Sequence, residues 1–169
     1  PIYLAGGHTL IPLMKQRLRA PTDVIDLSQI PDLQSISTEG PTLKIGALAR
    51  HADVAQSAVV AATTPMLGRL ASGIGDRQVR HRGTMGGSVA NNDPAADYPA
   101  AVLGLNMTVK TSKRSIPADE FFVDMFETAL EEGELLTGFS VPRVQSASYQ
   151  KFASPASRYA MVGVMVAVV

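Results

Sequence analysis

Residues 83–99 read Gly-Thr-Met-Gly-Gly-Ser-Val-Ala-Asn-Asn-Asp-Pro-Ala-Ala-Asp-Tyr-Pro, and this stretch carries more information than any other part of the chain. Its glycine pair, Gly86 and Gly87, stands between the hydroxyl residues Thr84 and Ser88. Glycine lets a backbone approach a ligand closely, and successive exposed N–H groups form a concavity that binds anions. The pattern predicts a glycine loop that holds a phosphate group. A turn with purely structural glycines is the alternative.

A second segment of this kind, Leu-Ala-Gly-Gly-His-Thr-Leu-Ile-Pro, occupies residues 4–12. A short apolar run precedes its glycines, and apolar residues at helical spacing follow them. A helix that begins here would present free N–H groups and a partial positive charge to an anion. Taken alone, the segment could equally be a tight strand-to-helix turn. Together, the two segments predict one ligand with two phosphate groups held between them.

Composition restricts the classes of partner. The chain has 169 residues, of which 46% are hydrophobic and 18% charged, as in an ordinary globular protein. Its formal net charge is zero, which argues against nucleic acid or an anionic membrane as the main partner. It has no cysteine, so it cannot hold a cysteine-ligated iron–sulfur cluster, and its three histidines lie too far apart in sequence to predict a metal site. No apolar run reaches the length of a membrane span and no signal peptide is visible, so we expect a cytoplasmic protein.

The order of elements predicts an α+β fold with two lobes. We expect a small β–α–β lobe over residues 1–50 and a larger lobe of helices and mostly antiparallel sheet over residues 51–169. Because the chain begins directly on a strand and ends inside an apolar run, we expect it to be a fragment of a longer subunit. The expected strands are 2–5, 24–27, 33–36, 43–47, 107–111, 114–117, 135–141, 149–153 and 160–169; the expected helices are 9–18, 50–62, 65–73 and 97–105; residues 121–130 are expected to be a helix or a packed loop.

Other polar residues near the glycine segments have two interpretations each. Asp97 could cap the helix that follows it or accept hydrogen bonds from a ribose. Asn91 and Asn92 could be turn residues or could reach a polar ligand edge. His8 could contact a ligand, but no serine, cysteine or carboxylate is placed beside it to form a triad. The residues therefore predict a binder of a diphosphate cofactor, with no catalytic side chain of its own.

Several ordered motifs resemble the FAD-binding medium subunits of molybdenum hydroxylases, of the xanthine dehydrogenase and carbon monoxide dehydrogenase type. The resemblance rests on Ala-Gly-Gly-His-Thr-Leu at 5–10 and on Thr-Met-Gly-Gly-Ser-Val-Ala-Asn-Asn-Asp-Pro-Ala-Ala-Asp at 84–97. It continues through residues 76–83, 133–138 and 155–163 in the family's order. The family's subunit has a further strand and helix ahead of the first motif and a further C-terminal domain, and neither is within these residues.

The resemblance implies a two-lobed FAD-binding fold and assigns residues to parts of FAD. It implies that the pyrophosphate is held by Leu4, Ala5, Gly6, Gly7, His8, Thr9, Leu10, Thr84, Gly86, Gly87 and Ser88. It implies that Asp97, with Asn91 and Asn92 nearby, binds the ribose or adenine side, that Ile74 and Gly75 line the cofactor, and that Leu135 or Leu136, Lys151 and Tyr159 approach the flavin ring.

The implied function is that of an oxidoreductase component. It would pass electrons from iron–sulfur clusters to FAD and then to an external acceptor, in a hetero-oligomer with a molybdopterin-carrying large subunit and an iron–sulfur small subunit. One alternative is a stand-alone flavin oxidase of the wider FAD-binding superfamily. Another is a non-catalytic nucleotide-binding assembly module.

Overall fold

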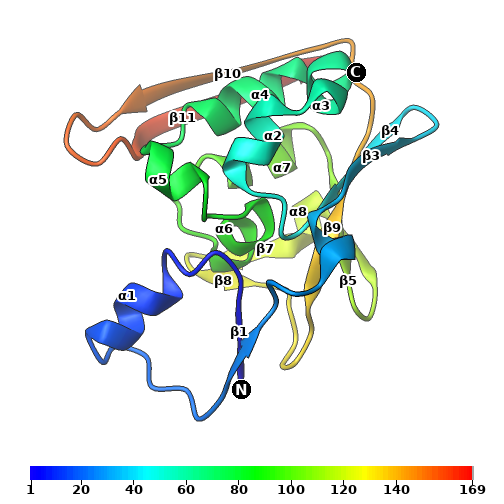
Figure 1. Cartoon of the computed structure of the whole chain (residues 1–169). Coiled ribbons are helices and arrows are strands. Elements are labelled where there is room, and N and C mark those ends of the chain that lie inside the picture. Colours follow the sequence, from blue (N-terminus) through cyan, green and yellow to red (C-terminus); the bar gives the residue numbers. More distant parts are fainter. Residues whose placement is uncertain (169) are drawn as a thin grey trace.

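The computed structural model describes residues 1–168, and its first unit is the expected small β–α–β lobe. Strands β1 (Ile2–Leu4) and β2 (Val24–Asp26) are parallel, and Ile2 pairs with Val24. Helix α1 (Leu10–Lys15) connects them and is shorter than expected. The Thr9 side chain makes no cap for this helix. In Figure 1 this lobe projects from the rest of the molecule, below the helix that carries the second glycine segment.

The second unit contains a five-stranded antiparallel sheet with strand order β3-β4-β9-β5-β6. Its first two strands form a hairpin with a turn at residues 40 and 41, and residues 31–34 form a 3₁₀ helix, so the strand expected over 33–36 starts later than expected. The strands are β3 (Ile36–Glu39), β4 (Thr42–Gly46), β5 (Thr108–Thr111), β6 (Ser115–Pro117) and β9 (Leu136–Val141).

This sheet bears on the boundary between the lobes. The division into residues 1–50 and 51–169 stays a prediction. However, β4 hydrogen-bonds to β9 with Leu43 opposite Val141, so the hairpin β3–β4 is part of the sheet of the second lobe. The pairing favours a boundary near residue 30.

Helices fill the space beside this sheet (Figure 1). The single helix expected over 50–62 is two helices, because the Ser57 hydroxyl accepts a hydrogen bond from the Val60 N–H and caps the second one. The helices are α2 (His51–Gln56), α3 (Ala58–Thr63), α4 (Pro65–Ser72), α5 (Arg77–Arg80), α6 (Met85–Asn91) and α7 (Tyr98–Gly104). None of the helices in residues 1–168 is long and apolar enough to cross a bilayer.

The glycine stretch 83–99 is not the continuous loop that we expected. Helix α6 begins inside it, and Gly86 and Gly87 lie in its first turn. Thr84 drives this start, because its hydroxyl accepts the N–H of Gly87 at 3.1 Å and so caps the helix. Asn92, in the left-handed conformation with φ 45°, ends it.

Two further hairpins complete the fold. Strands β10 (Ser146–Ala153) and β11 (Ala160–Val168) are antiparallel, and they pack against α4 and α7 respectively. The strand expected over 160–169 is thus present, although Val169 lies outside the described residues. Most of residues 121–130 form neither the expected helix nor the expected packed loop. After the short helix α8 (Ala118–Phe121), they form the hairpin of β7 (Phe122–Asp124) and β8 (Glu127–Thr128).

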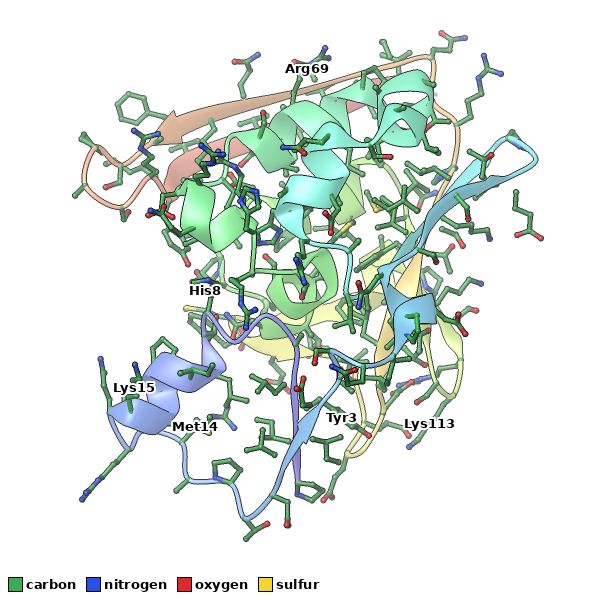
Figure 2. The ribbon with its side chains drawn as sticks, viewed as in Figure 1. Tyr3, His8, Met14, Lys15, Arg69 and Lys113 are labelled. Atoms are coloured by element: carbon green, nitrogen blue, oxygen red, sulfur yellow. The ribbon has the colours of Figure 1, made fainter. Side chains whose placement is uncertain are left out.

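One carboxylate fixes the loop that leads into β9. Glu134 is almost fully buried and accepts hydrogen bonds from the Thr111 hydroxyl (2.6 Å), Arg114 Nε (3.1 Å) and the Glu131 N–H (2.9 Å). The bond from Arg114, followed by those from Glu131 and Thr111, lowers the pKa of Glu134 from 4.5 to about 2. The Tyr3 hydroxyl reaches the same loop and donates to the Gly133 carbonyl at 3.1 Å, which links β1 to it (Figure 2).

We predict that Glu134→Gln lowers the free energy of unfolding by on the order of 2 kcal/mol at neutral pH, because several donors lose a charged acceptor. The pKa of Glu134 is lower in the folded chain, so its contribution is present above pH 4.5 and is lost as the pH falls towards 2. Urea unfolding of the two proteins should therefore differ at neutral pH and converge in acid. Exposed Glu132→Gln is the matched control. A difference in the free energy of unfolding that stays the same in acid would contradict the role given to the Glu134 carboxylate.

Candidate functional site

The two glycine segments lie directly against each other. A Cβ on Gly6 would overlap the carbonyl oxygen of Arg82 and would lie 2.8 Å from the Cα of Gly83. A Cβ on Gly87 would lie 3.7 Å from the Cβ of Ala5. The structure therefore brings together the segments that the sequence singled out, and Gly6 is required because two backbones meet at its Cα.

The first segment supplies free hydrogen-bond donors. Across the described part of the chain, the backbone N–H groups of residues 6–9 have no acceptor, while the Gly7 carbonyl accepts the N–H of Ile11. Gly7 has φ 77°, a conformation that glycine adopts without strain. His8 is exposed beside these N–H groups, where the segment faces the helices of the second unit (Figure 2). Leu4 and Leu10 flank the segment and are partly buried. This arrangement fits an anion.

The second segment differs from our expectation in one respect. Its N–H groups are already used: Met85 donates to the Ala49 carbonyl, Gly86 to that of Ala47, and Gly87 to the Thr84 hydroxyl. The expected cradle of free N–H groups is therefore wrong for these three residues. Gly87 remains exposed and Ser88 partly exposed, so the segment presents a bare backbone surface beside Ala5.

His51 supports the second segment from behind. Its N–H donates to the Gly83 carbonyl, and a Cβ on Gly83 would lie 2.6 Å from His51 Nε2. Its ring lies 5.4 Å from the ring of Tyr98, and within residues 1–168 neither His51 Nδ1 nor the Tyr98 hydroxyl has a hydrogen-bond partner. Burial, and after it the nearby His8 and Arg80, lowers the pKa of His51 to about 4. The ring is therefore neutral at physiological pH.

Asp97 is the buried anion at the other end of the site. It makes no side-chain cap for α7, so that part of our expectation is wrong. Its Oδ1 accepts the Tyr149 hydroxyl at 2.6 Å, and its Oδ2 lies 2.8 Å from Lys151 Nζ. Burial, followed by the bond to Asp97, raises the pKa of Tyr149. Whether Asp97 also binds a ribose stays a prediction.

The remaining predicted residues lie in different surroundings. Gly75 packs against Arg158, and a Cβ on Gly75 would lie 2.7 Å from the Cβ of Arg158. Burial, followed by the nearby Asp93 and Asp97, raises the pKa of Tyr159. Ile74 is partly buried against the main core. Leu135, like Ala5, is partly buried against a small second core of leucines, whereas Leu136 lies in the main core and is 4% exposed. This favours Leu135 over Leu136 as a ligand contact.

The two asparagines have different roles in the fold. Asn91 is the partly buried last residue of α6. The Asn92 side-chain amide donates to the backbone carbonyls of Asp124 and Glu127 at 2.8 and 3.0 Å, and the backbone carbonyl of Asn92 accepts the Phe126 N–H. Asn92 thus holds the tip of the β7–β8 hairpin with its amide protons. Its assignment to a ligand stays a prediction that would have to rest on its side-chain oxygen.

Two residues that support the site, Tyr149 and His51, are not among the site residues predicted from the sequence. A signal for Tyr149 exists, because residues two apart on a strand share a face and Lys151 was already a candidate. His51 carries no such signal, since its contacts with Gly83 and Tyr98 depend on the way the helices pack.

We predict that His51→Leu makes stability less sensitive to mild acid. In the unfolded chain His51 takes up a proton near its ordinary pKa of 6.5, but in the folded chain only at about 4, so the wild type loses stability as the pH falls through this window. Urea unfolding at neutral pH and at about pH 5 measures the difference. The exposed His81→Leu is the control. An unchanged pH dependence in His51→Leu would refute the burial argument.

The chain matches a family described as the FAD binding domain in molybdopterin dehydrogenase, over residues 2–144. It is 41% identical over 143 residues to the carbon monoxide dehydrogenase medium chain of Hydrogenophaga pseudoflava, covering 82% of this chain and 50% of that one. It is 36% identical over 171 residues to the glyceraldehyde dehydrogenase medium chain of Sulfolobus acidocaldarius, covering 98% and 61%. The chain thus spans between half and about 60% of these relatives.

Solved structures show the same fold. The crystal structure of a Cu,Mo-CO dehydrogenase superposes with a TM-score of 0.93 at 35% identity, covering 98% of this chain and 60% of that one. The carbon monoxide dehydrogenase of Hydrogenophaga pseudoflava gives 0.91 at 37% identity, covering 96% and 59%. The α+β fold and the cofactor class expected from the sequence are thereby confirmed. The family match and these identities agree with the paired glycine segments, and the chain belongs to the FAD-binding domains of the molybdopterin dehydrogenases.

Proposed function

We propose that this chain is the FAD-binding part of a medium subunit of a molybdenum hydroxylase, and that it relays electrons from iron–sulfur clusters through FAD to an external acceptor. One observation carries the proposal. In the described residues the N–H groups of residues 6–9 have no partner, and they belong to the segment that packs, through Gly6, directly on the backbone of Arg82 and Gly83 and, through Ala5, beside Gly87. A diphosphate fits between such surfaces, because it needs donors and close backbone approach.

The residues divide the proposed binding task. The N–H groups of residues 6–9 would hold the pyrophosphate, with Gly87 and Ser88 opposite. The buried cluster of Asp97 and Lys151, with Tyr159 beside it, would orient the ring or ribose end. Leu135, partly buried against the same small core as Ala5, would provide an apolar contact. When bound, FAD supplies the redox chemistry, while the protein supplies position and electrostatics.

The proposed partners follow from what the relatives are. Those that match include medium chains and medium subunits of carbon monoxide dehydrogenase, glyceraldehyde dehydrogenase and nicotine 6-hydroxylase. A medium chain belongs to a multi-chain assembly. We therefore propose a hetero-oligomer with a molybdopterin-carrying large subunit and an iron–sulfur small subunit. The cytoplasmic location stays a prediction, which fractionation of the host cell would test.

We predict that the complete natural protein, purified with its co-purifying subunits, contains about one FAD per copy of this chain and also molybdenum and iron. Visible absorbance, flavin release and metal analysis measure these contents. Flavin without molybdenum or iron partners would instead support a stand-alone oxidase. Partners without flavin would support an assembly module, and either result would overturn the proposal.

We predict that Gly6→Ala weakens FAD binding by at least about tenfold, because the new Cβ would overlap the Arg82 carbonyl and push the two segments apart. Titration of the FAD-free protein with FAD, followed by flavin fluorescence, measures the change. Gly68→Ala in α4 is the matched control, since its Cβ would meet no atom closer than 3.6 Å. Equal affinities in the two variants would show that the contact at Gly6 does not shape the site.

A further inference from the structure

The Asp97 carboxylate receives both of its side-chain partners from one face of strand β10. Tyr149 and Lys151 are two residues apart and point the same way, with the hydroxyl on Oδ1 at 2.6 Å and the ammonium at 2.8 Å from Oδ2. Only 6% of the Asp97 side chain and 12% of the Lys151 side chain are exposed. Each carboxylate oxygen thus has its own donor in a largely buried cluster.

The neighbouring strand is built around the Tyr149 hydroxyl. Gly163 on β11 pairs with Lys151, and a Cβ on Gly163 would overlap the Tyr149 hydroxyl and lie 3.1 Å from the ring carbon that carries it. A residue with a side chain at position 163 would therefore displace the hydroxyl from Asp97. Gly163 has an ordinary, negative φ, so close approach rather than backbone conformation accounts for the glycine.

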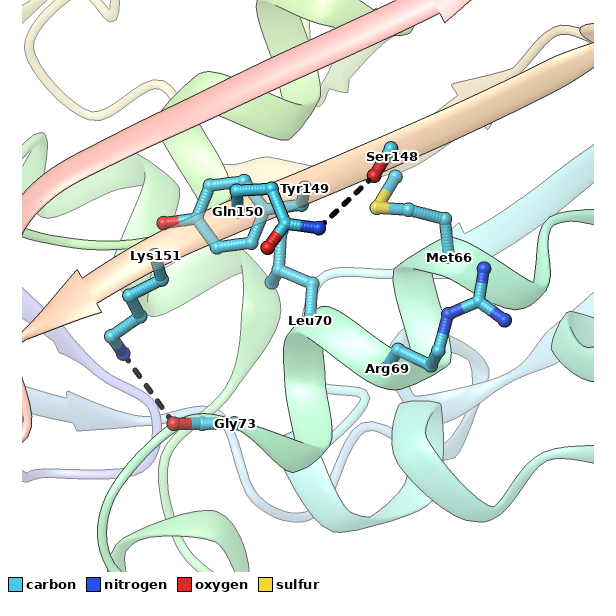
Figure 3. Close-up of a pocket in the computed structure, with 8 residues that line it drawn as sticks. All are labelled: Met66, Arg69, Leu70, Gly73, Ser148, Tyr149, Gln150 and Lys151. Carbon is cyan, nitrogen blue, oxygen red and sulfur yellow. Dashed lines mark hydrogen bonds between the residues drawn. The ribbon is translucent and has the colours of Figure 1, made fainter.

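The geometry defines what the hydroxyl does for Lys151. A buried carboxylate with one oxygen unsatisfied is costly, and it would turn to share its single cationic donor between both oxygens. With Oδ1 held by Tyr149, Oδ2 stays directed at Lys151 Nζ. The ammonium then lies 3.4 Å from the Gly73 carbonyl, at one end of a cavity of about 250 Å³ between α4 and β10 (Figure 3).

We propose that Tyr149 is a positioning residue, which fixes Asp97 so that Asp97 in turn fixes the Lys151 ammonium toward bound FAD, and that Gly163 provides the space for it. The proposal rests on the proposed function. Tyr149 acts through Asp97 and does not touch the cofactor itself. Loosening the ammonium weakens the positive field at the flavin, which lowers both FAD affinity and the flavin midpoint potential.

A double-mutant cycle tests this in the complete natural protein with its co-purifying subunits. The variants are Tyr149→Phe, Lys151→Met and the pair, and the readouts are the FAD dissociation constant and the flavin midpoint potential. We expect Tyr149→Phe to weaken FAD binding by about tenfold and to lower the potential in the direction of Lys151→Met. In the Lys151→Met background, Tyr149→Phe should change the potential no further. Additive shifts, or no shift in Tyr149→Phe, would overturn the proposal.

Gly163→Ala provides an independent approach to the same atom. Alone, it should reproduce the loss of affinity and the lower potential of Tyr149→Phe, because its Cβ displaces the hydroxyl. Combined with Tyr149→Phe, it should add little, since the hydroxyl it displaces is gone. A wild-type potential in Gly163→Ala would also count against the proposal.

Tyr98→Phe is the matched control. Tyr98 is also buried and is adjacent to Asp97, but its hydroxyl has no partner within residues 1–168, so its loss should leave affinity and potential unchanged. Thermal unfolding of the FAD-free variants shows whether each one is folded. A wild-type protein that binds no FAD would overturn the proposed function before any variant is made. If the wild-type protein binds FAD and Tyr149→Phe has the same FAD affinity and midpoint potential, this inference is overturned while the proposed function stands.

Discussion

The contact on which the rest of the structure depends is that between the backbone of Gly6 and the backbone of Arg82 and Gly83. No side chain separates the two segments at this point, and a single methyl group on Gly6 would overlap the Arg82 carbonyl. Backbone packed this closely must be held in place by the elements on either side, and the surrounding segments provide this support.

Segment 47–51 holds the second glycine segment from the sheet side. It makes three backbone hydrogen bonds with residues 83–86, which include the bridge between Arg50 and Thr84, and the buried ring of His51 lies against Gly83. These bonds consume the N–H groups that a phosphate would otherwise use. The consequence is a division of roles in which the second segment is rigid and bare, while the first keeps its donors free.

The sequence predicted the glycine segments, the β–α–β unit and most strands because these features are local. A glycine pair beside hydroxyls, or apolar residues at period two, can be recognised without knowledge of the fold. Prediction from the sequence failed where a contact between residues far apart in the chain determines the local structure. The hairpin over 122–128 is held by the amide of Asn92, more than thirty residues earlier. The carbonyls of Ala47 and Ala49 accept the first N–H groups of α6, which therefore do not remain free. The partners of Asp97 lie more than fifty residues away.

The two ends of the candidate site solve the same electrostatic problem in opposite ways. At residues 6–9 the chain offers uncharged donors with no partner, which leaves their hydrogen bonding to be completed by an anion. At Asp97 the carboxylate already has its donors within the protein, because the Tyr149 hydroxyl and the Lys151 ammonium each hold one of its oxygens. A ligand that spans both ends needs negative charge at one of them only. A dinucleotide has this distribution of charge, because its pyrophosphate is charged and its ring systems are neutral.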